Sequence, residues 1–401
     1  MARWQINLIV LWFGQFMVLG GMTMIIPFLP LYIREMGITE EHAVATWAGL
    51  IFAGNFVTSF LAQPIWGNLA DRYGRKMMLL RSGFGMSAVM VLMGFATHPW
   101  QLLLLRMLNG TISGYAPAAV ALMSSNTPKE KMGFAMGTLQ SGAVAGTIMG
   151  PFLGGLLADA IGFRNIFYVT GALLFTASFL SMLLVREKFD KAEQSAKPKI
   201  SIVQSFKQLS QVPQLPSLYA VTFLIQFSML CTMPLMPLFV EKLHGPGGNL
   251  AFYAGLVSSV TGFSNMIASP LLGRLADRIG HERILMISLI GASAAFIPQA
   301  LAQKVWQLLA ARFLLGIFMG GLLPTVNALI RKHTPGGMES RSYSFNSSAL
   351  SLGNMSGPVI GGATSSFVPI QGLFAVASGL LLFNSLWVRR TLVRKLPSGA
   401  E

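Results

Sequence analysis

The sequence predicts an all-α integral membrane protein whose twelve transmembrane helices form two six-helix bundles. Of its 401 residues, 53% are hydrophobic and 11% are charged, whereas a soluble domain is typically about 25% charged. The segment 8–33 contains no charged residue and no histidine, and it exceeds the roughly 20 residues that a helix needs to cross a bilayer. In addition, the two halves of the chain repeat each other. These observations indicate a multi-pass membrane protein.

Apolar segments recur along both halves of the chain. The predicted spans are 8–33, 46–69, 78–97, 100–123, 133–158, 164–186, 216–240, 251–273, 284–303, 305–330, 341–367 and 369–388. A charged and weakly hydrophobic stretch separates the sixth span from the seventh. The predicted organisation is therefore an N-terminal bundle (1–186), a cytoplasmic linker (187–214) and a C-terminal bundle (215–401).

The basic residues predict the orientation, because lysine and arginine are enriched in cytoplasmic loops. With the N-terminus inside, the predicted outer segments contain few basic residues, namely Arg34, Arg164, Lys242 and Lys304. The predicted cytoplasmic segments contain most of the others, Arg81 included. Both termini are therefore predicted to be cytoplasmic. The net charge of +15 follows from this topology, and we expect no nucleic-acid partner, because the basic residues interrupt apolar segments and do not gather on one face.

An offset of 206 or 207 residues aligns the two halves. WQLLLLRMLNG (100–110) matches WQLLAARFLLG (306–316), and GPFLGG (150–155) matches GPVIGG (357–362). The matches include Trp, Arg and Pro, which chance does not align in apolar sequence. Two parallel copies of a six-helix unit are an arrangement that secondary transporters use to expose one site to each side in turn.

A charged phrase is also repeated, as GNLADRYGRK (67–76) and GRLADRIGHE (273–282). Asp71 can satisfy backbone donors at a helix N-terminus, where the helix dipole favours a carboxylate. We interpret the phrase as a latch on the cytoplasmic gate; the alternative is a topology anchor with a helix cap. The candidate latch residues are Gly67, Asp71, Arg72, Gly74, Arg75, Asp277 and Arg278.

Glycines recur every four residues in the fifth span. Residues at this spacing share one helix face, and small side chains there let two membrane helices pack backbone to backbone. The pattern indicates either close packing alone or a seam that slides between transport states. The seam candidates are Gly142, Gly146, Gly150, Pro151 and Gly154, with Gly353, Gly357, Pro358 and Gly361 as their counterparts in the second half.

Two arginines lie within otherwise apolar spans. Arg106 and Arg312 occupy matching positions in the two halves, and an arginine at the centre of a membrane helix costs about 2.5–3.5 kcal/mol on insertion scales. We expect each to face a cavity or a partner. The alternative is that each side chain extends to the membrane interface.

These motifs resemble those of the major facilitator superfamily. GNLADRYGRK is similar to the loop signature between its second and third helices, RMLNG (106–110) to its fourth-helix arginine motif, and GAVAGTIMGPFLGG (142–155) to the fifth-helix motif of its antiporters. The resemblance is to the twelve-helix drug:proton antiporter branch, in particular to bacterial multidrug exporters of the fluoroquinolone type.

The resemblance implies proton-driven export of small amphipathic molecules across the bacterial cytoplasmic membrane by a monomer without a cofactor. It implies a latch role for Asp71, proton coupling for Arg106, and a seam role for Gly150 with Pro151. It also implies a cavity lined by helices one, four, seven and ten. The cavity candidates are Gln15, Asn109, Tyr115, Gln226, Met229, Arg312, Asn327, Phe345 and Asn346.

The acidic residues depart from the family pattern. Many drug antiporters carry a carboxylate deep in helix one, seven or ten, but none of the fourteen acids of this chain lies in the middle of a predicted span. A cavity without an acid should favour zwitterionic, anionic or neutral amphiphiles over permanent cations. The proton-coupling candidates are Arg106, Asp71, Glu35, Glu241 and Asp159.

Two alternatives remain within the transporter class: a proton-coupled transporter of one specific metabolite, and a lipid or glycolipid flippase. An enzyme is not expected, because the five histidines are scattered and no metal-ligand spacing occurs. The single cysteine, Cys231, excludes an intrachain disulfide. We therefore expect neither a metal site nor a cofactor.

Overall fold

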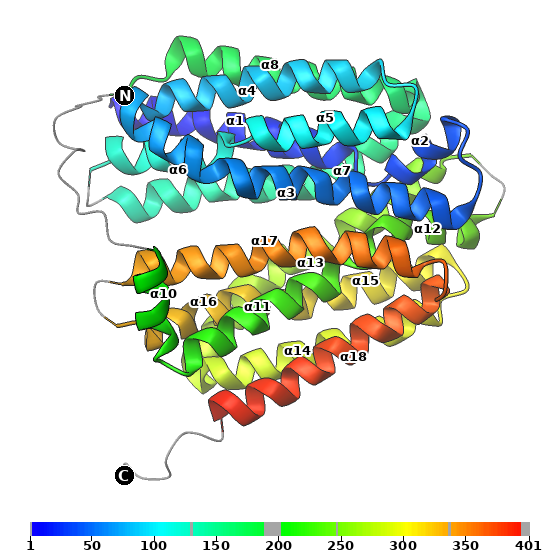
Figure 1. The fold of residues 1–401 in the computed structure, drawn as a ribbon. Coiled ribbons are helices and arrows are strands. Elements are labelled where there is room, and N and C mark those ends of the chain that lie inside the picture. Colours follow the sequence, from blue (N-terminus) through cyan, green and yellow to red (C-terminus); the bar gives the residue numbers. More distant parts are fainter. Residues whose placement is uncertain (1, 129–130, 188–201, 246–247, 336–337, 394–401) are drawn as a thin grey trace. The chain divides into compact units, whose positions relative to one another are not determined.

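The computed structural model describes residues 2–128, 131–187, 202–245, 248–335 and 338–393, and every regular element in these ranges is helical (Figure 1). The first half contains α1 (Arg3–Met24), α2 (Leu29–Glu35), α3 (Glu41–Tyr73), α4 (Arg75–Gly94), α5 (Pro99–Ile112), α6 (Tyr115–Asn126), α7 (Met132–Ile161) and α8 (Phe163–Leu184). The second half contains α11 (Gln214–Leu230), η2 (Met233–Leu235), α12 (Met236–His244), α13 (Leu250–Ile279), α14 (His281–Ala300), α15 (Val305–Met319), α16 (Leu322–His333), α17 (Glu339–Thr364), α18 (Ile370–Val388) and η3 (Arg389–Val393).

One helix lies where the sequence indicated only a linker. Helix α10 (Ile202–Ser210) falls inside the predicted linker 187–214. Two of its described apolar residues, three positions apart, pack against the protein, since Phe206 contacts the ring of Phe345 and Leu209 is fully buried. A helix of nine residues is too short to span a membrane. The low mean hydropathy that identified the linker therefore conceals a short amphipathic helix.

Four of the predicted spans are broken helices. The first consists of α1 and α2, the fourth of α5 and α6, the seventh of α11, η2 and α12, and the tenth of α15 and α16. Proline and glycine explain the breaks: Pro27 and Pro234 lie at the first and third, and Gly114 and Gly321 at the second and fourth. Each break in the first half has its counterpart in the second half near the repeat offset.

Ten helical stretches among the described residues are long and apolar enough to cross a membrane. The predicted spans 100–123 and 341–367 are not among them. The first is divided between two short helices, and the second coincides with α17, which is rich in serine and glycine. The membrane-spanning helical fold is confirmed, and the count of twelve spans stays a prediction.

The chain folds into two compact units. Unit 1 comprises Met1–Glu40, Leu50–Lys197 and Pro246–Ser259, and unit 2 comprises Glu41–Gly49, Pro198–Gly245 and Val260–Glu401. In unit 1, α1 packs along α7 and α8, and α4 packs along α8 (Figure 1). In unit 2, α11 packs along α17, and α14 packs along α18. The continuous domains proposed from the repeat, 1–186 and 215–401, stay a prediction.

The seam glycines of the fifth span bring α7 against the backbone of α1. A Cβ atom at Gly142 would lie 2.7 Å from the carbonyl oxygen of Trp12, and one at Gly146 would lie 2.6 Å from that of Phe16. Gly150 and Gly154 lie farther along the same face. A Cβ atom at Gly150 would meet the main-chain oxygen of Gly20, and one at Gly154 would meet that of Met24.

The second half repeats this contact between α17 and α11. A Cβ atom at Gly353 or Gly357 would lie 3.0 Å from the carbonyl oxygen of Phe223 or Phe227, respectively, and Gly361 meets the carbonyl of Cys231. The predicted backbone-to-backbone packing is confirmed in both units. Whether these surfaces slide during transport stays a prediction.

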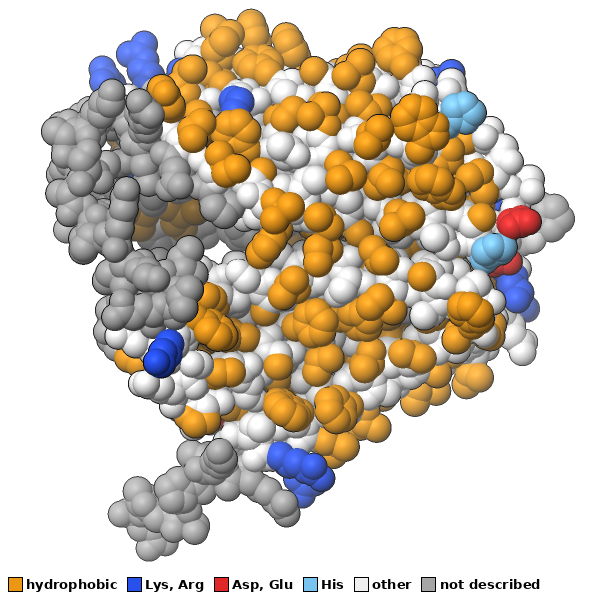
Figure 2. All heavy atoms as spheres, in the orientation of Figure 1, with side chains coloured by type: hydrophobic (Ala, Val, Ile, Leu, Met, Phe, Trp, Pro, Cys, Tyr) orange, Lys and Arg blue, Asp and Glu red, His pale blue; other side chains and the backbone are white. Residues whose placement is uncertain are grey.

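Large hydrophobic side chains are exposed along many helices. Leu61, Phe95 and Leu301 are 65%, 67% and 72% exposed, and Figure 2 shows hydrophobic side chains spread over the helices on the visible face, with charged side chains near helix ends. Water disfavours apolar surface of this extent, whereas lipid does not. The surface therefore fits a protein embedded in a bilayer.

We predict that Gly146→Ala lowers the stability of the protein, because the new methyl group meets only backbone atoms of Phe16 and Gly20, which cannot rotate away. Overpacking of this kind costs about 1–3 kcal/mol. Gly137 lies on the same helix with nothing within 4 Å of a Cβ position. Gly137→Ala should therefore be neutral or stabilising by up to about 1 kcal/mol. Thermal unfolding in detergent measures both, and equal unfolding temperatures would contradict the close contact.

Candidate functional site

The break between α5 and α6 is surrounded by polar side chains of α3 and α4. Gly114 has a φ of 141°, which favours glycine, and the carbonyl of Ser113 accepts a hydrogen bond of 3.4 Å from an Nη2 of Arg81. The guanidinium carbon of Arg81 lies 3.4 Å from the ring centroid of Trp66, which is a cation–π contact. Arg81 thus joins α4 to the interrupted helix.

Further hydrogen bonds join α3 to the end of α5 around the break. The indole nitrogen of Trp66 donates to the carbonyl of Thr111 at 2.6 Å, and the hydroxyl of Thr58 donates to that of Met107 at 2.6 Å. The hydroxyls of Ser59 and Ser113 are 3.0 Å apart. Irregular backbone at membrane depth needs such partners, because lipid offers none. Sequence reasoning missed this cluster, since it assigned Arg81 only to membrane topology.

Three predicted cavity residues of the first half are buried inside unit 1. Asn109 is fully buried and donates to the amide oxygen of Asn55 at 2.8 Å. Gln15 is 1% exposed, and its amide nitrogen has no hydrogen-bond partner in the described structure. Tyr115 is 2% exposed, and its hydroxyl lies 3.0 Å from that of Ser181. The role of these three residues in lining a cavity stays a prediction.

The two intramembrane arginines have no acidic partner among the described residues. Arg106 lies on α5 and is 5% exposed. Arg312 lies on α15, and its Nε is buried without a hydrogen-bond partner. A buried guanidinium without a counter-ion is costly, so both positions suit an anionic group that arrives from outside the protein.

Predicted cavity residues of the second half form a hydrogen-bonded group in unit 2. The amide nitrogen of Asn346 on α17 donates to the amide oxygen of Asn327 on α16 at 3.0 Å. The hydroxyl of Thr222 on α11 donates to the amide oxygen of Asn346 at 2.6 Å. Phe345 contacts the ring of Tyr219. The structure thus brings Asn327 and Asn346 together and adds Thr222, which the sequence did not single out.

Gln226 and Met229 lie on α11, both partly exposed. The Cβ atom of Gln226 would lie 2.8 Å from a Cβ atom at Gly353 of α17. The helix that carries these two candidates is therefore held against α17 by the seam glycines.

The predicted latch is described only in part. Gly67, Asp71 and Arg72 lie on α3, but their side chains are outside the described structure. Gly74 has a φ of 94° and forms the turn into α4, and Gly280 has a φ of 100° at the matching turn into α14. In the second half, Asp277 and Arg278 are both exposed, and Oδ1 of Asp277 lies 3.5 Å from Nε2 of His281.

Glu187 caps the helix that follows the latch phrase. Its carboxylate accepts hydrogen bonds of 2.9 Å from the backbone N–H groups of Arg75 and Lys76 at the beginning of α4. The guanidinium of Arg75 donates to the carbonyl of Ala121 on α6 at 3.1 Å. The turn after the predicted latch is therefore tied to α6 and to the end of α8.

The acidic candidates for proton coupling whose side chains are described lie near helix ends. Glu35 is the last residue of α2 and is exposed, and Glu241 lies on α12. Asp159 near the end of α7 accepts hydrogen bonds from the backbone N–H groups of Ala251 (3.3 Å) and Phe252 (2.8 Å), within unit 1. Its carboxylate thus caps α13. Among the described residues, no three His, Cys, Asp or Glu side chains form a metal-ligand group.

Comparisons with known proteins agree with this fold. The Major Facilitator Superfamily matches residues 11–260 and again residues 218–400. The multidrug resistance protein MdtG of Salmonella typhimurium is 40% identical over 393 residues, which cover 98% of this chain and 97% of that protein. The protein of the same name from Serratia proteamaculans is 41% identical over 387 residues, covering 96% of this chain and 94% of that protein.

Solved structures add a match in fold. A bacterial homologue of the human lysosomal transporter Spinster, crystallised in an inward-facing and occupied conformation, superimposes with a TM-score of 0.77. It shares 17% sequence identity, and the match covers 98% of each chain.

We predict that the ring of Trp66 stabilises the broken helix through Arg81. Trp66→Phe keeps an aromatic face but loses the bond to Thr111, and it should cost about 1 kcal/mol. Trp66→Leu also loses the cation–π contact and should cost about 1–2 kcal/mol more. Thermal unfolding measures the stability of both variants. Trp100→Phe is the control, because Trp100 is 52% exposed and its replacement should change the stability little. Equal effects of the two Trp66 variants would contradict the contact with Arg81.

Proposed function

The chain belongs to the Major Facilitator Superfamily, and we propose that it exports small amphipathic compounds from the bacterial cytoplasm in exchange for protons. The observation that carries this proposal is the sequence identity of 40% to a multidrug resistance protein, which extends over 98% of the chain. The mechanism we propose is alternating access, as in other transporters that are built from two repeated bundles.

The broken helices support transport. In secondary transporters, discontinuous helices form the substrate site, because their interrupted backbone and helix ends offer hydrogen-bonding groups inside the membrane. Here the first, fourth, seventh and tenth predicted spans are all interrupted, at matching positions in the two halves. These are the four spans that the family resemblance implies as cavity helices.

Arg106 and Arg312 indicate the charge of the substrate. The described acids lie near helix ends, whereas these two arginines lie within apolar helices without an acidic partner. We propose that they meet a carboxylate or another anionic group of the transported compound. Zwitterionic and anionic amphiphiles should therefore be preferred over permanent cations.

The test is substrate-driven proton movement in proteoliposomes under an imposed pH gradient. Norfloxacin, which carries a carboxylate, should release protons from the wild-type protein, and ethidium should release far fewer. Arg106→Gln should weaken the response to norfloxacin by about 10–100-fold, because a hydrogen bond to a charged group contributes about 1.5–3 kcal/mol. Lys304→Gln, which removes an exposed charge next to α15, should have little effect.

Stronger transport of ethidium than of norfloxacin would refute the preference for anionic groups. No proton movement with either compound, in protein that is folded and inserted, would refute drug:proton antiport and would favour a transporter of one metabolite or of a lipid.

Replacing Asp159 by asparagine distinguishes a helix cap from a proton carrier, because an amide side chain can accept the capping hydrogen bonds but cannot carry the proton. Asparagine also accepts hydrogen bonds at a helix N-terminus, whereas replacement by alanine costs about 0.5–2 kcal/mol. If Asp159 acts only as the cap of α13, Asp159→Asn should keep both stability and proton release, and Asp159→Ala should lower the unfolding temperature. Loss of proton release in a stable Asp159→Asn protein would identify Asp159 as a proton carrier.

A further inference from the structure

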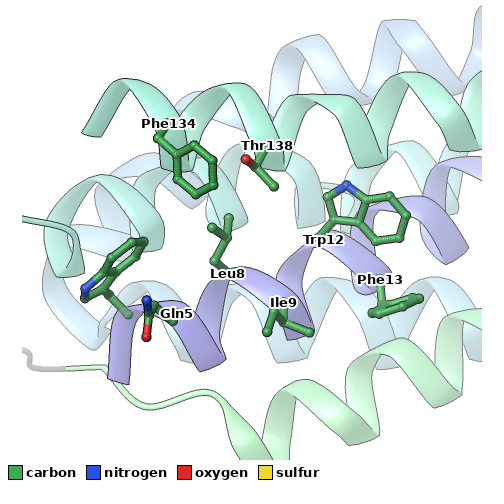
Figure 3. Close-up of a pocket in the computed structure, with 8 residues that line it drawn as sticks. Gln5, Leu8, Ile9, Trp12, Phe13, Phe134 and Thr138 are labelled. Carbon is green, nitrogen blue, oxygen red and sulfur yellow. The ribbon is translucent and has the colours of Figure 1, made fainter. Parts of the chain in front are cut away.

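An apolar pocket of about 380 Å³ lies between the beginning of α1 and the beginning of α7 (Figure 3). Its wall consists mainly of aromatic and aliphatic side chains, namely Trp4, Leu8, Ile9, Trp12 and Phe13 of α1 and Phe134 of α7. Figure 3 shows Phe134 directed from α7 towards Leu8 of α1. Phe134 is 66% exposed and Phe13 is 48% exposed, so a molecule can enter the pocket from the side of these helices.

The pocket wall is held in place by specific contacts. The indole nitrogen of Trp12 donates to the hydroxyl of Ser141 at 3.0 Å. The rings of Trp12 and Phe16 are parallel, with centroids 5.9 Å apart. Gly142 permits this arrangement, because a Cβ atom there would lie 3.0 Å from the Trp12 ring. The aromatic surface is therefore formed before any ligand binds.

A polar cavity of about 770 Å³ adjoins this pocket and shares Trp4 with it. Its charged lining residues are Arg3, Lys76, Arg186 and Glu187, which amount to three positive charges and one negative charge. The carboxylate of Glu187 is bound to the N-terminus of α4, and the ammonium of Lys76 donates to the carbonyl of Val185 at 2.6 Å.

Arg3 and Arg186 are the cations of this cavity that remain available to a ligand. Both side chains are exposed, and neither forms a salt bridge within the described part of the chain. The carbonyl and N–H of Arg186 are bound by the side chain of Asn7 at 2.8 and 3.1 Å, so its backbone is fixed beside α1. The cavity thus presents two guanidinium groups, which suit a phosphate.

The two cavities together have the dimensions of one lipid leaflet. The helix rises about 15 Å from Arg3 to Phe13, and the hydrocarbon core of a bilayer is about 30 Å thick, or about 15 Å for each leaflet. Trp4 lies between the charged and the apolar cavity, as tryptophan does at membrane interfaces. The basic end belongs to the predicted cytoplasmic side, whose leaflet contains anionic lipids.

We propose that these cavities bind one anionic phospholipid of the cytoplasmic leaflet. Its phosphate lies between the guanidinium groups of Arg3 and Arg186, and one acyl chain runs along α1 against Leu8, Trp12 and Phe134. The site follows a helix through the depth of a leaflet and is polar only at one end, which fits an acyl chain better than a compact drug. This proposal does not depend on the compounds that the protein exports.

The experiment measures quenching of tryptophan fluorescence in vesicles by lipids with brominated acyl chains. Brominated phosphatidylglycerol is compared with brominated phosphatidylcholine, and the contribution of Trp12 is the difference between wild-type protein and Trp12→Phe. We expect phosphatidylglycerol to quench Trp12 at a lower mole fraction than phosphatidylcholine. In Arg3→Gln/Arg186→Gln this preference should fall roughly 30-fold, the effect of removing two basic residues near an anionic lipid.

Two variants make the charge effect specific. Arg389→Gln/Arg390→Gln removes the same charge from η3 of unit 2 and should leave the preference at Trp12 unchanged. Arg3→Lys/Arg186→Lys retains the charge and should keep most of the preference, which also covers the case in which the glutamine variant does not fold.

Three results would overturn the proposal. The first is equal quenching of Trp12 by both lipids in wild-type protein. The second is an equal loss of preference in the η3 variant. The third is displacement of phosphatidylglycerol by millimolar inorganic phosphate or by norfloxacin, which would identify a phosphate site or a drug entry site instead.

Discussion

The close approach of two pairs of helix backbones determines the architecture of this transporter. Along α7 and α17, glycines four residues apart leave no room for a Cβ atom against α1 and α11. Helices in lipid gain no hydrophobic energy from association, so their contacts depend on van der Waals packing over short distances. The partners match at the repeat offset: Gly146 meets Phe16, and Gly353 meets Phe223. One packing solution therefore serves both halves.

Close packing of α1 also positions groups with chemical roles. Because α7 lies directly on α1, the ring of Trp12 rests beside Gly142 and donates to Ser141. In unit 2, the same kind of contact holds α11 beside α17, where Thr222 reaches Asn346. The interrupted first and seventh spans are thus supported by α7 and α17, whose helical backbone is continuous. At the break between α5 and α6, Arg81 donates a hydrogen bond to the backbone.

Sequence reasoning recovered the helical membrane fold and its repeat, because hydropathy and glycine spacing are local properties of the chain. It also placed Asn327 and Asn346 among the cavity candidates, because polar residues are rare in apolar membrane helices, and the structure shows that the two are hydrogen-bonded. It did not find the contacts that depend on tertiary structure. From the sequence alone, Arg81 is a signal of topology, because the Trp66 ring that it contacts belongs to another helix. Glu187 likewise belongs to the predicted linker, and only the structure shows that it caps α4. The breaks within spans were missed because hydropathy averages over them.

The distribution of charge limits the ways in which proton movement, as proposed, can be linked to transport. A carboxylate inside the membrane could carry a proton and attract a cation, but the described acids lie near helix ends, and Asp159 is engaged with the N-terminus of α13. Arg81, Arg106 and Arg312 lie within apolar helices, and guanidinium groups do not release protons near neutral pH. Arginine can therefore attract an anionic group but cannot carry the proton itself. Under drug:proton antiport, the proton must travel on an acid near the membrane surface or on the substrate.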